Sequence, residues 1–149
     1  MKKFAFRLQP VLKLRRQQED QKKRVVGAIL AEMNEYQRQA VEMARAVEDQ
    51  RGSLKQNIQG RVNVRWIAHY QGYVTSMQQA INTRVNSVAQ LQQKLAVARE
   101  ELAEAAKRTK IVEKLRERRK ARYDTRLKRL EVREMDEAGA NTFLRSREM

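Results

Sequence analysis

The residue types that usually carry catalysis are nearly absent from this sequence. Histidine occurs once, as His69, and cysteine does not occur, so a histidine triad, a thiolate nucleophile or a Cys/His zinc site lacks its members. The acidic pairs Glu100/Glu101 and Asp136/Glu137 are typical of solvated helix faces, and no glycine-rich phosphate loop is present. We therefore predict a protein that is not an enzyme and that has no metal site, cofactor or small-molecule substrate.

Basic side chains are the functional groups that this sequence has in excess. The net charge is +15, and between Lys107 and Arg133 thirteen Lys and Arg stand against four Asp and Glu. This balance implies an anionic partner. Three interpretations stay open: a solvated face that serves solubility, phosphate contacts with nucleic acid, and insertion into an acidic protein groove. Sequence-specific DNA recognition is disfavoured because the basic run follows the coiled-coil pattern instead of preceding it, and no zinc motif is present.

A second candidate surface combines aromatic and apolar side chains within RWIAHYQGYVTSMQQAINTR, residues 65–84. Two adjacent stripes occur there at helical spacing, and a pair of helices needs only one seam. We expect the other stripe to stay partly uncovered and to bind a partner, unless both close over a thicker core. The row that we expect to be exposed is Tyr73, Met77, Ala80 and Arg84.

Two long helices must position these residues. Residues 74–112 contain no proline or glycine, and their stripe positions follow at steps of three or four, which is the seam of a coiled coil. This stripe is Met77, Ile81, Val85, Val88, Leu91, Leu95, Ala98, Leu102, Ala105, Thr109 and Val112. A matching stripe comes earlier in the chain: Val26, Ile29, Met33, Tyr36, Ala40, Met43, Val47, Gln50 and Leu54.

Turn-forming residues separate the two stripes. Asn57, Gly60 and Asn63 favour a break there, so we predict one all-α domain, an antiparallel coiled-coil hairpin. Its helices cover about 8–56 and 64–138, with a tip at 57–63 and a frayed tail at 139–149. Residue n should lie opposite about 120 − n, so that the longer second helix overhangs from Leu115 onward. Pairing between two chains stays open. No apolar run spans a membrane and no signal peptide is expected.

Three segments resemble a known family. The opening FAFRLQPVLKLRRQQED resembles the start of the flagellar export protein FliJ family, with a Phe-x-Phe-x-Leu beginning, then Leu-x-x-Arg and acidic residues. The stretch RWIAHYQGYVTSM is similar to the Trp/Tyr/Tyr region of that family's second helix. The segment RLKRLEVREMDEA resembles its Arg-rich, acidic closing segment. The similarity covers nearly the whole chain.

The resemblance implies a non-enzymatic component of the flagellar type III export apparatus. Such a protein would be cytoplasmic and peripheral to the cell membrane at the flagellar base. It would be a two-helix stalk, similar to that of rotary ATPases, with its joined ends in the centre of the hexameric export ATPase, promoting assembly and activity. The tip would contact the cytoplasmic domain of the export gate, and export chaperones would also bind.

Carried over by position, the ATPase contacts would be Phe4, Leu8, Leu12, Arg15, Arg116, Arg119, Arg122, Tyr123, Arg126, Leu127 and Arg129. The export-gate contacts would be Tyr73, Met77, Ala80 and Arg84. The alternatives are a basic nucleic-acid-binding coiled coil and the equivalent stalk of a virulence injectisome. The tail after Gly139 receives no role.

Overall fold

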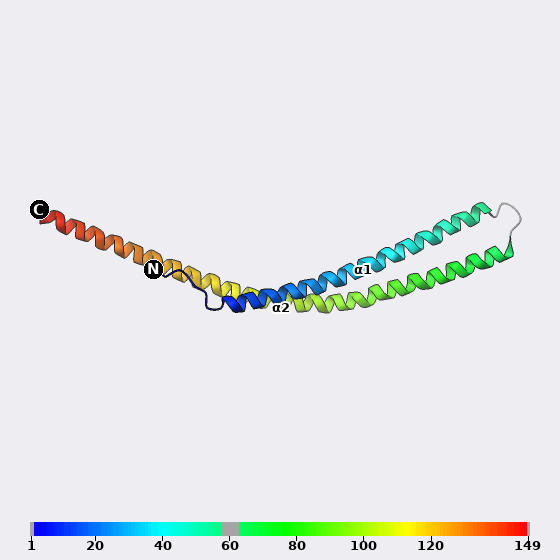
Figure 1. The fold of residues 1–149 in the computed structure, drawn as a ribbon, viewed down its shortest axis with the longest axis horizontal. Helices are drawn as coiled ribbons and strands as arrows, with labels where there is room; N and C mark the ends of the chain where they lie inside the picture. Colours follow the sequence, from blue (N-terminus) through cyan, green and yellow to red (C-terminus); the bar gives the residue numbers. More distant parts are fainter. Residues whose placement is uncertain (1, 58–62, 149) are drawn as a thin grey trace. The chain divides into compact units, whose positions relative to one another are not determined.

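The computed structural model describes residues 2–57 and 63–148. Two helices, α1 (Gln9–Asn57) and α2 (Val64–Arg147), hold nearly all of these residues, and the described ranges contain no strand (Figure 1). The predicted all-α hairpin with a longer second helix is therefore confirmed. Of the predicted tip, residues 58–62 lie outside the described residues. Over the described part, neither helix has a stretch long and apolar enough to cross a bilayer.

The chain packs as two units, each of which contains a piece of α1 and a piece of α2. One unit is Asp20–Ala103, and the other consists of Met1–Glu19 with Glu104–Met149. We call them the hairpin unit and the terminal unit.

The hairpin unit has a narrow core along the predicted seam. Met33, Leu91 and Leu95 are buried, and the residues packed against them are Val26, Ile29, Tyr36 and Val88. Met33 and Val88, which the sequence predicted to lie opposite each other, both belong to this core. Each large apolar side chain removed from water contributes about 1.5–3 kcal/mol, so this one-dimensional core is the main stabilising element of the unit.

Two polar contacts fix the register between the helices of the hairpin unit. The Nε of Arg84 donates to Oε1 of Gln39 at 3.2 Å, and Nζ of Lys22 lies 2.8 Å from Oε2 of Glu101. Both pairs place residue n opposite about 123 − n, about three residues from the predicted register. The prediction took residue 60 as the centre of the tip, whereas the numbers of the observed pairs sum to 123 instead of 120.

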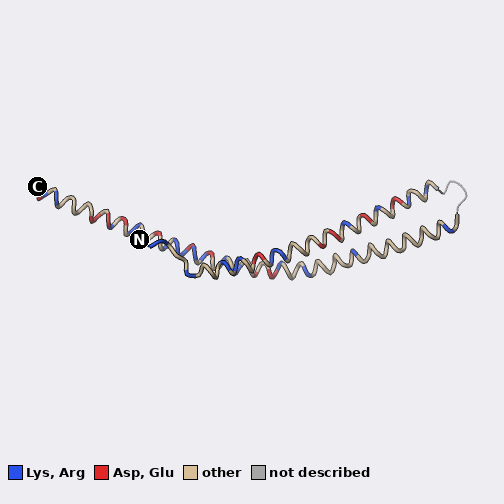
Figure 2. The backbone as a smooth tube through the Cα atoms, in the orientation of Figure 1, with Lys and Arg blue, Asp and Glu red and all other residues tan. Residues whose placement is uncertain are grey.

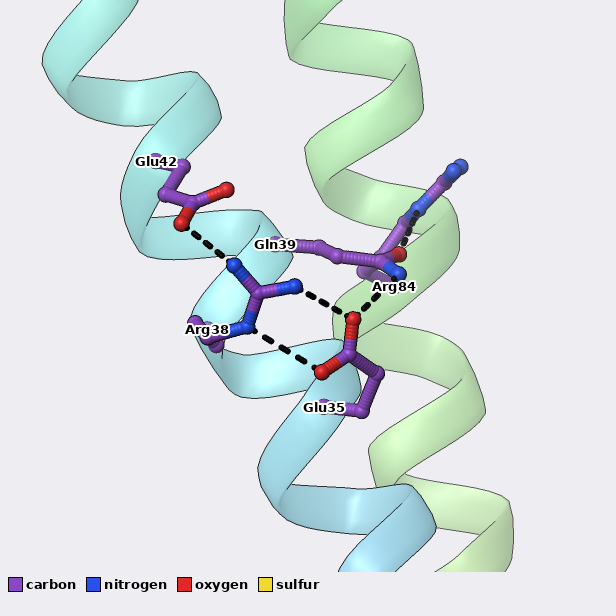
Figure 3. Close-up of polar contacts among 5 residues, drawn as sticks. All are labelled: Glu35, Arg38, Gln39, Glu42 and Arg84. Carbon is purple, nitrogen blue, oxygen red and sulfur yellow. Dashed lines mark hydrogen bonds and ion pairs between the residues drawn. The ribbon is translucent and has the colours of Figure 1, made fainter.

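A hydrogen-bonded chain of side chains leads from α1 to α2 in this unit (Figure 3). The guanidinium of Arg38 donates to both carboxylate oxygens of Glu35 and to Glu42, while the Gln39 amide donates to Glu35 and accepts from Arg84. The hydrogen bond from Arg38 holds the pKa of Glu35 below its ordinary 4.5, and that bond to Glu35 in turn raises the pKa of Arg38. This chain favours one alignment of the two helices at this level.

Asn63, one of the turn-forming residues of the predicted break, caps α2, which begins at Val64. Its side-chain Oδ1 accepts the backbone N–H of Arg65 at 3.1 Å, and its carbonyl accepts the N–H groups of Trp66 and Ile67. The side-chain oxygen thereby satisfies one of the free donors of the first turn, which is how an N-cap stabilises a helix.

In the terminal unit, α2 is helical well past the position where fraying was expected. It continues through Gly139, which has no positive φ, to Arg147. The hydroxyl of Thr142 donates to the Ala138 carbonyl at 2.8 Å, and the Arg147 guanidinium carbon lies over the Phe143 ring, 5.6 Å from its centroid. Glycine in a helix costs about 1 kcal/mol relative to alanine, which is too little to end this helix.

Candidate functional site

The first residues of the chain form an extended strap that precedes α1. We define the strap as residues 2–8. Phe6 is 8% exposed and Phe4 and Leu8 are half-buried, whereas Ala5 and Arg7 between them are exposed. This alternation is the pattern of an extended segment with one side against a neighbour. The Gln9 N–H then donates to the Phe6 carbonyl at 3.0 Å and starts the turn into α1.

The strap docks on α2 through aromatic side chains. The Phe4 and Tyr123 ring centroids lie 5.6 Å apart with the planes tilted by 50°, and the Tyr123 hydroxyl donates to the Lys2 carbonyl at 2.5 Å. The Arg119 guanidinium carbon lies over the Phe6 ring, 5.7 Å from its centroid. The prediction that α2 is unpaired from Leu115 onward is therefore wrong, because strap contacts reach Tyr123.

Behind the strap, the first turns of α1 hold a small core in the terminal unit. Leu12 is fully buried, and Thr109 is 3% exposed, with its hydroxyl donating to the Ala105 carbonyl at 3.1 Å. Arg16 and Glu113 form an exposed ion pair at 3.3 Å. These contacts hold the start of α1, where the strap ends, against α2. The strap residues Ala5 and Arg7 stay exposed.

The basic side chains of α2 remain at the surface beside the strap. Five arginines recur every three or four residues and are all exposed, so they follow one side of the helix. We call this set the basic row: Arg116, Arg119, Arg122, Arg126 and Arg129. Figure 2 shows Lys and Arg dominating this part of α2. Guanidinium groups at these spacings can bind carboxylates or phosphates through pairs of N–H donors.

The remaining predicted ATPase contacts divide by burial. Phe4, Leu8, Arg15, Tyr123 and Leu127 are half-buried within the terminal unit, next to or within the segments that carry the strap and the basic row. Arg15 donates to the Gln18 side chain at 3.2 Å. Leu12 is fully buried, so it belongs to the core and cannot contact a partner while the unit stays folded. We therefore exclude Leu12 from the candidate surface.

The row that we expected to be exposed in the hairpin unit is only partly exposed. Tyr73, Met77, Ala80 and Arg84 are all half-buried, and Arg84 is hydrogen-bonded across to Gln39. Val85, which we expected in the seam, is instead 54% exposed. The reason is that two overlapping stripes were available, and the one containing Arg84 faces α1. The role of this row in binding the export gate stays a prediction.

Near the start of α2, aromatic rings gather in the hairpin unit. Trp66 and Tyr70 stack with centroids 6.1 Å apart and planes within 14°. A groove there is lined by Gln50, Trp66, His69, Tyr70 and Tyr73. From Val64 to Ala98, α2 carries three basic residues and no acidic one, which appears as a largely tan arm in Figure 2.

Sequence reasoning missed how the strap is used. It singled out the opening segment through its family resemblance but not its docking at Tyr123 and Arg119, although Phe4, Phe6 and Leu8 alternate in the manner of an extended segment just before Pro10. Within the described residues, no group of three or more His, Asp or Glu is placed to hold a metal ion. The arrangement offers surfaces for binding: a strap, a basic row and an aromatic groove.

The comparisons with known proteins point to one family. The sequence matches the family described as Flagellar FliJ protein over residues 3–148, which is nearly its whole length. No curated protein matches the chain, and no solved structure does. The match includes both helices, the strap from Lys3 onward and the basic row. The chain therefore belongs to the flagellar FliJ protein family.

Proposed function

We propose that this chain is a stalk that binds the centre of the hexameric flagellar export ATPase and promotes its assembly and activity. Family membership makes the chain a component of the flagellar export apparatus, which supports a non-catalytic role at the flagellar base. The single observation that carries the finer proposal is the basic row, five exposed arginines on a helix that extends beyond the strap.

The chemistry of the terminal unit suits a protein partner with acidic groups. The basic row supplies planar donors, and half-buried Tyr123 and Leu127 add apolar area beside them. The proposed surface is the basic row with Phe4, Leu8, Arg15, Tyr123 and Leu127. A ring of identical subunits could gather around such a helix end and be stabilised as an assembled hexamer, because anything that binds only the assembled form favours it.

Two further partners belong to the same proposal. The cytoplasmic domain of the export gate would bind the hairpin unit near Tyr73, Met77, Ala80 and Arg84. Because these side chains are half-buried, their exposed edges or the neighbouring Val85 would have to supply the contact. Export chaperones would also bind, and the chain would work at the cytoplasmic face of the membrane.

The proposal is tested with the purified export ATPase. Adding the chain at ATPase concentrations too low for the hexamer to form should raise the hydrolysis rate and increase the fraction of hexamer in sedimentation. The same addition at concentrations where the hexamer is already complete should raise the rate less. Absence of stimulation at every ratio would overturn the proposal.

The alternative is a nucleic-acid-binding coiled coil, which the charge of +15 favours. Its affinity would fall steeply with salt and would not depend on the identity of a protein partner. Capture of partners from a nuclease-treated lysate separates the two functions. Retention of the export ATPase supports the stalk, whereas loss of all partners supports nucleic acid. Capture of an injectisome ATPase instead would support a virulence-secretion stalk.

A further inference from the structure

Like charges are brought together where the strap meets α2. The strap carries Lys2, Lys3 and Arg7 and no acidic residue. It lies against Arg119 and Tyr123, within a stretch of α2, residues 116–123, that has five basic residues and one acidic residue. Cations held this close repel one another, so the aromatic contacts must hold the strap in place against this repulsion.

One guanidinium in this cluster, that of Arg119, lies over an aromatic ring. Phe6 is 8% exposed and lies under Arg119, whose side chain makes no ion pair within the described residues. A ring beneath a guanidinium restricts its orientation and leaves the N–H donors at its edge free. Those donors match the two oxygens of a carboxylate, and a donor group that is already oriented loses less entropy when it binds.

We propose that the strap and the basic row form one joint site for a carboxylate-rich protein segment, in which Phe6 is a positioning residue that orients Arg119. Binding of the anionic segment relieves the repulsion between the strap and α2, so ligand binding and strap docking stabilise each other. The class of ligand is independent of the function proposed above, whereas its identification as a segment of the export ATPase rests on that function.

The rings favour a protein segment over a nucleic acid. Single-stranded nucleic acids bind basic grooves by stacking bases on free aromatic faces. Here Phe4 is paired with Tyr123, Phe6 lies under Arg119, and the Tyr123 hydroxyl is bonded to the Lys2 carbonyl. These rings are therefore engaged in contacts within the chain instead of standing free for base stacking.

The test measures binding of a labelled ten-residue polyglutamate peptide to the full chain at fixed salt. Phe6→Leu keeps an apolar side chain but removes the ring, and it should weaken binding about two- to fivefold, the size of an exposed cation–π contact. Arg119→Lys should weaken it similarly, because lysine cannot bind in a bidentate manner. Phe6→Tyr should restore binding to the wild-type level. Amide exchange at residues 4–8 should slow when the peptide binds.

The chain contains a matched control at the end of α2. Arg147 lies over Phe143 at 5.6 Å, the same kind of contact away from the strap, so Phe143→Leu should leave polyglutamate binding unchanged. Unchanged binding by Phe6→Leu with a normal helical spectrum, or an equal loss in Phe143→Leu, would overturn the proposal. Tighter binding of a ten-nucleotide DNA strand than of polyglutamate would overturn the class of ligand.

The two proposals can fail separately. If Phe6→Leu weakens polyglutamate binding but the wild-type chain does not stimulate the ATPase, only the stalk function fails. If the chain stimulates the ATPase and Phe6→Leu changes neither measurement, only the joint site fails.

Discussion

Charge reversal at three positions of the basic row tests whether this side of α2 binds the ATPase. The variant carries Arg119→Glu, Arg122→Glu and Arg126→Glu. It changes residues 107–133 from thirteen basic and four acidic side chains to ten and seven. All three arginines are exposed, and glutamate and arginine have similar helix propensities, so α2 should remain helical.

The size of the effect follows from exposed ion pairs. Such a pair contributes about 0.2–1 kcal/mol, and reversing the charge adds a repulsion of the same order, so three reversals together cost roughly 1–6 kcal/mol. A central value of about 3 kcal/mol corresponds to a loss of affinity of roughly a hundredfold. Arg119→Glu also removes the contact with Phe6, which is worth about 0.5–1 kcal/mol to strap docking.

The assay is stimulation of ATP hydrolysis as a function of added chain, with circular dichroism as the folding control. A matched variant with Arg24→Glu, Arg45→Glu and Arg99→Glu has the same change in charge at exposed positions of the hairpin unit. We expect the first variant to need roughly a hundredfold more protein and the second to behave like the wild type within about threefold. Equal effects of the two variants would show that only net charge matters and would refute the assignment.

Three further predictions concern the fold. Leu91→Ala, in the buried core of the hairpin unit, should lower the free energy of unfolding by about 2–5 kcal/mol. Val97→Ala, at a residue that is 56% exposed, should change it by less than about 0.5 kcal/mol. Chemical denaturation measures both, and equal losses would contradict the core assignment. Because Arg38 lowers the pKa of Glu35 in the folded chain, this stabilisation is present above the ordinary value of 4.5 and is lost as the pH falls through the folded value. The difference in thermal midpoint between wild type and Arg38→Gln should therefore shrink on acidification, and a growing difference would contradict the contact. Gly139→Ala should slow amide exchange over residues 138–147 by up to about fivefold, because alanine favours the helix by about 1 kcal/mol and its Cβ would meet no atom within 4 Å. Unchanged exchange would mean that Gly139 does not limit the helical stability of this part of α2.

The seam was predictable because its periodicity is a direct record of burial. Met33, Leu91, Leu95 and Ala98 are buried at the positions that steps of three and four assign to them. The pattern failed where two stripes overlap, at Arg84 and Val85. Periodicity favoured the apolar valine, but the long arginine side chain can pack its methylene groups at a seam edge and reach Gln39 with its head group.

Contacts outside the helical repeat could not be read from periodicity. The docking of Phe4 on Tyr123 joins residues that are far apart in sequence, and its position depends on the register between α1 and α2. An error of about three residues in that register moves each contact along the helix by roughly one turn. Of the candidate ATPase contacts, the exposure of the basic row was foreseeable from charge, whereas the complete burial of Leu12 was not.

The stoichiometry of ATPase stimulation tests the central claim most directly. A stalk at the centre of a ring has one place per hexamer. Titration of the wild-type chain into a fixed amount of ATPase should therefore raise the hydrolysis rate until about one chain is present per six ATPase subunits, and then level off. Stimulation that continues to one chain per subunit, or no stimulation at any ratio, would contradict the account.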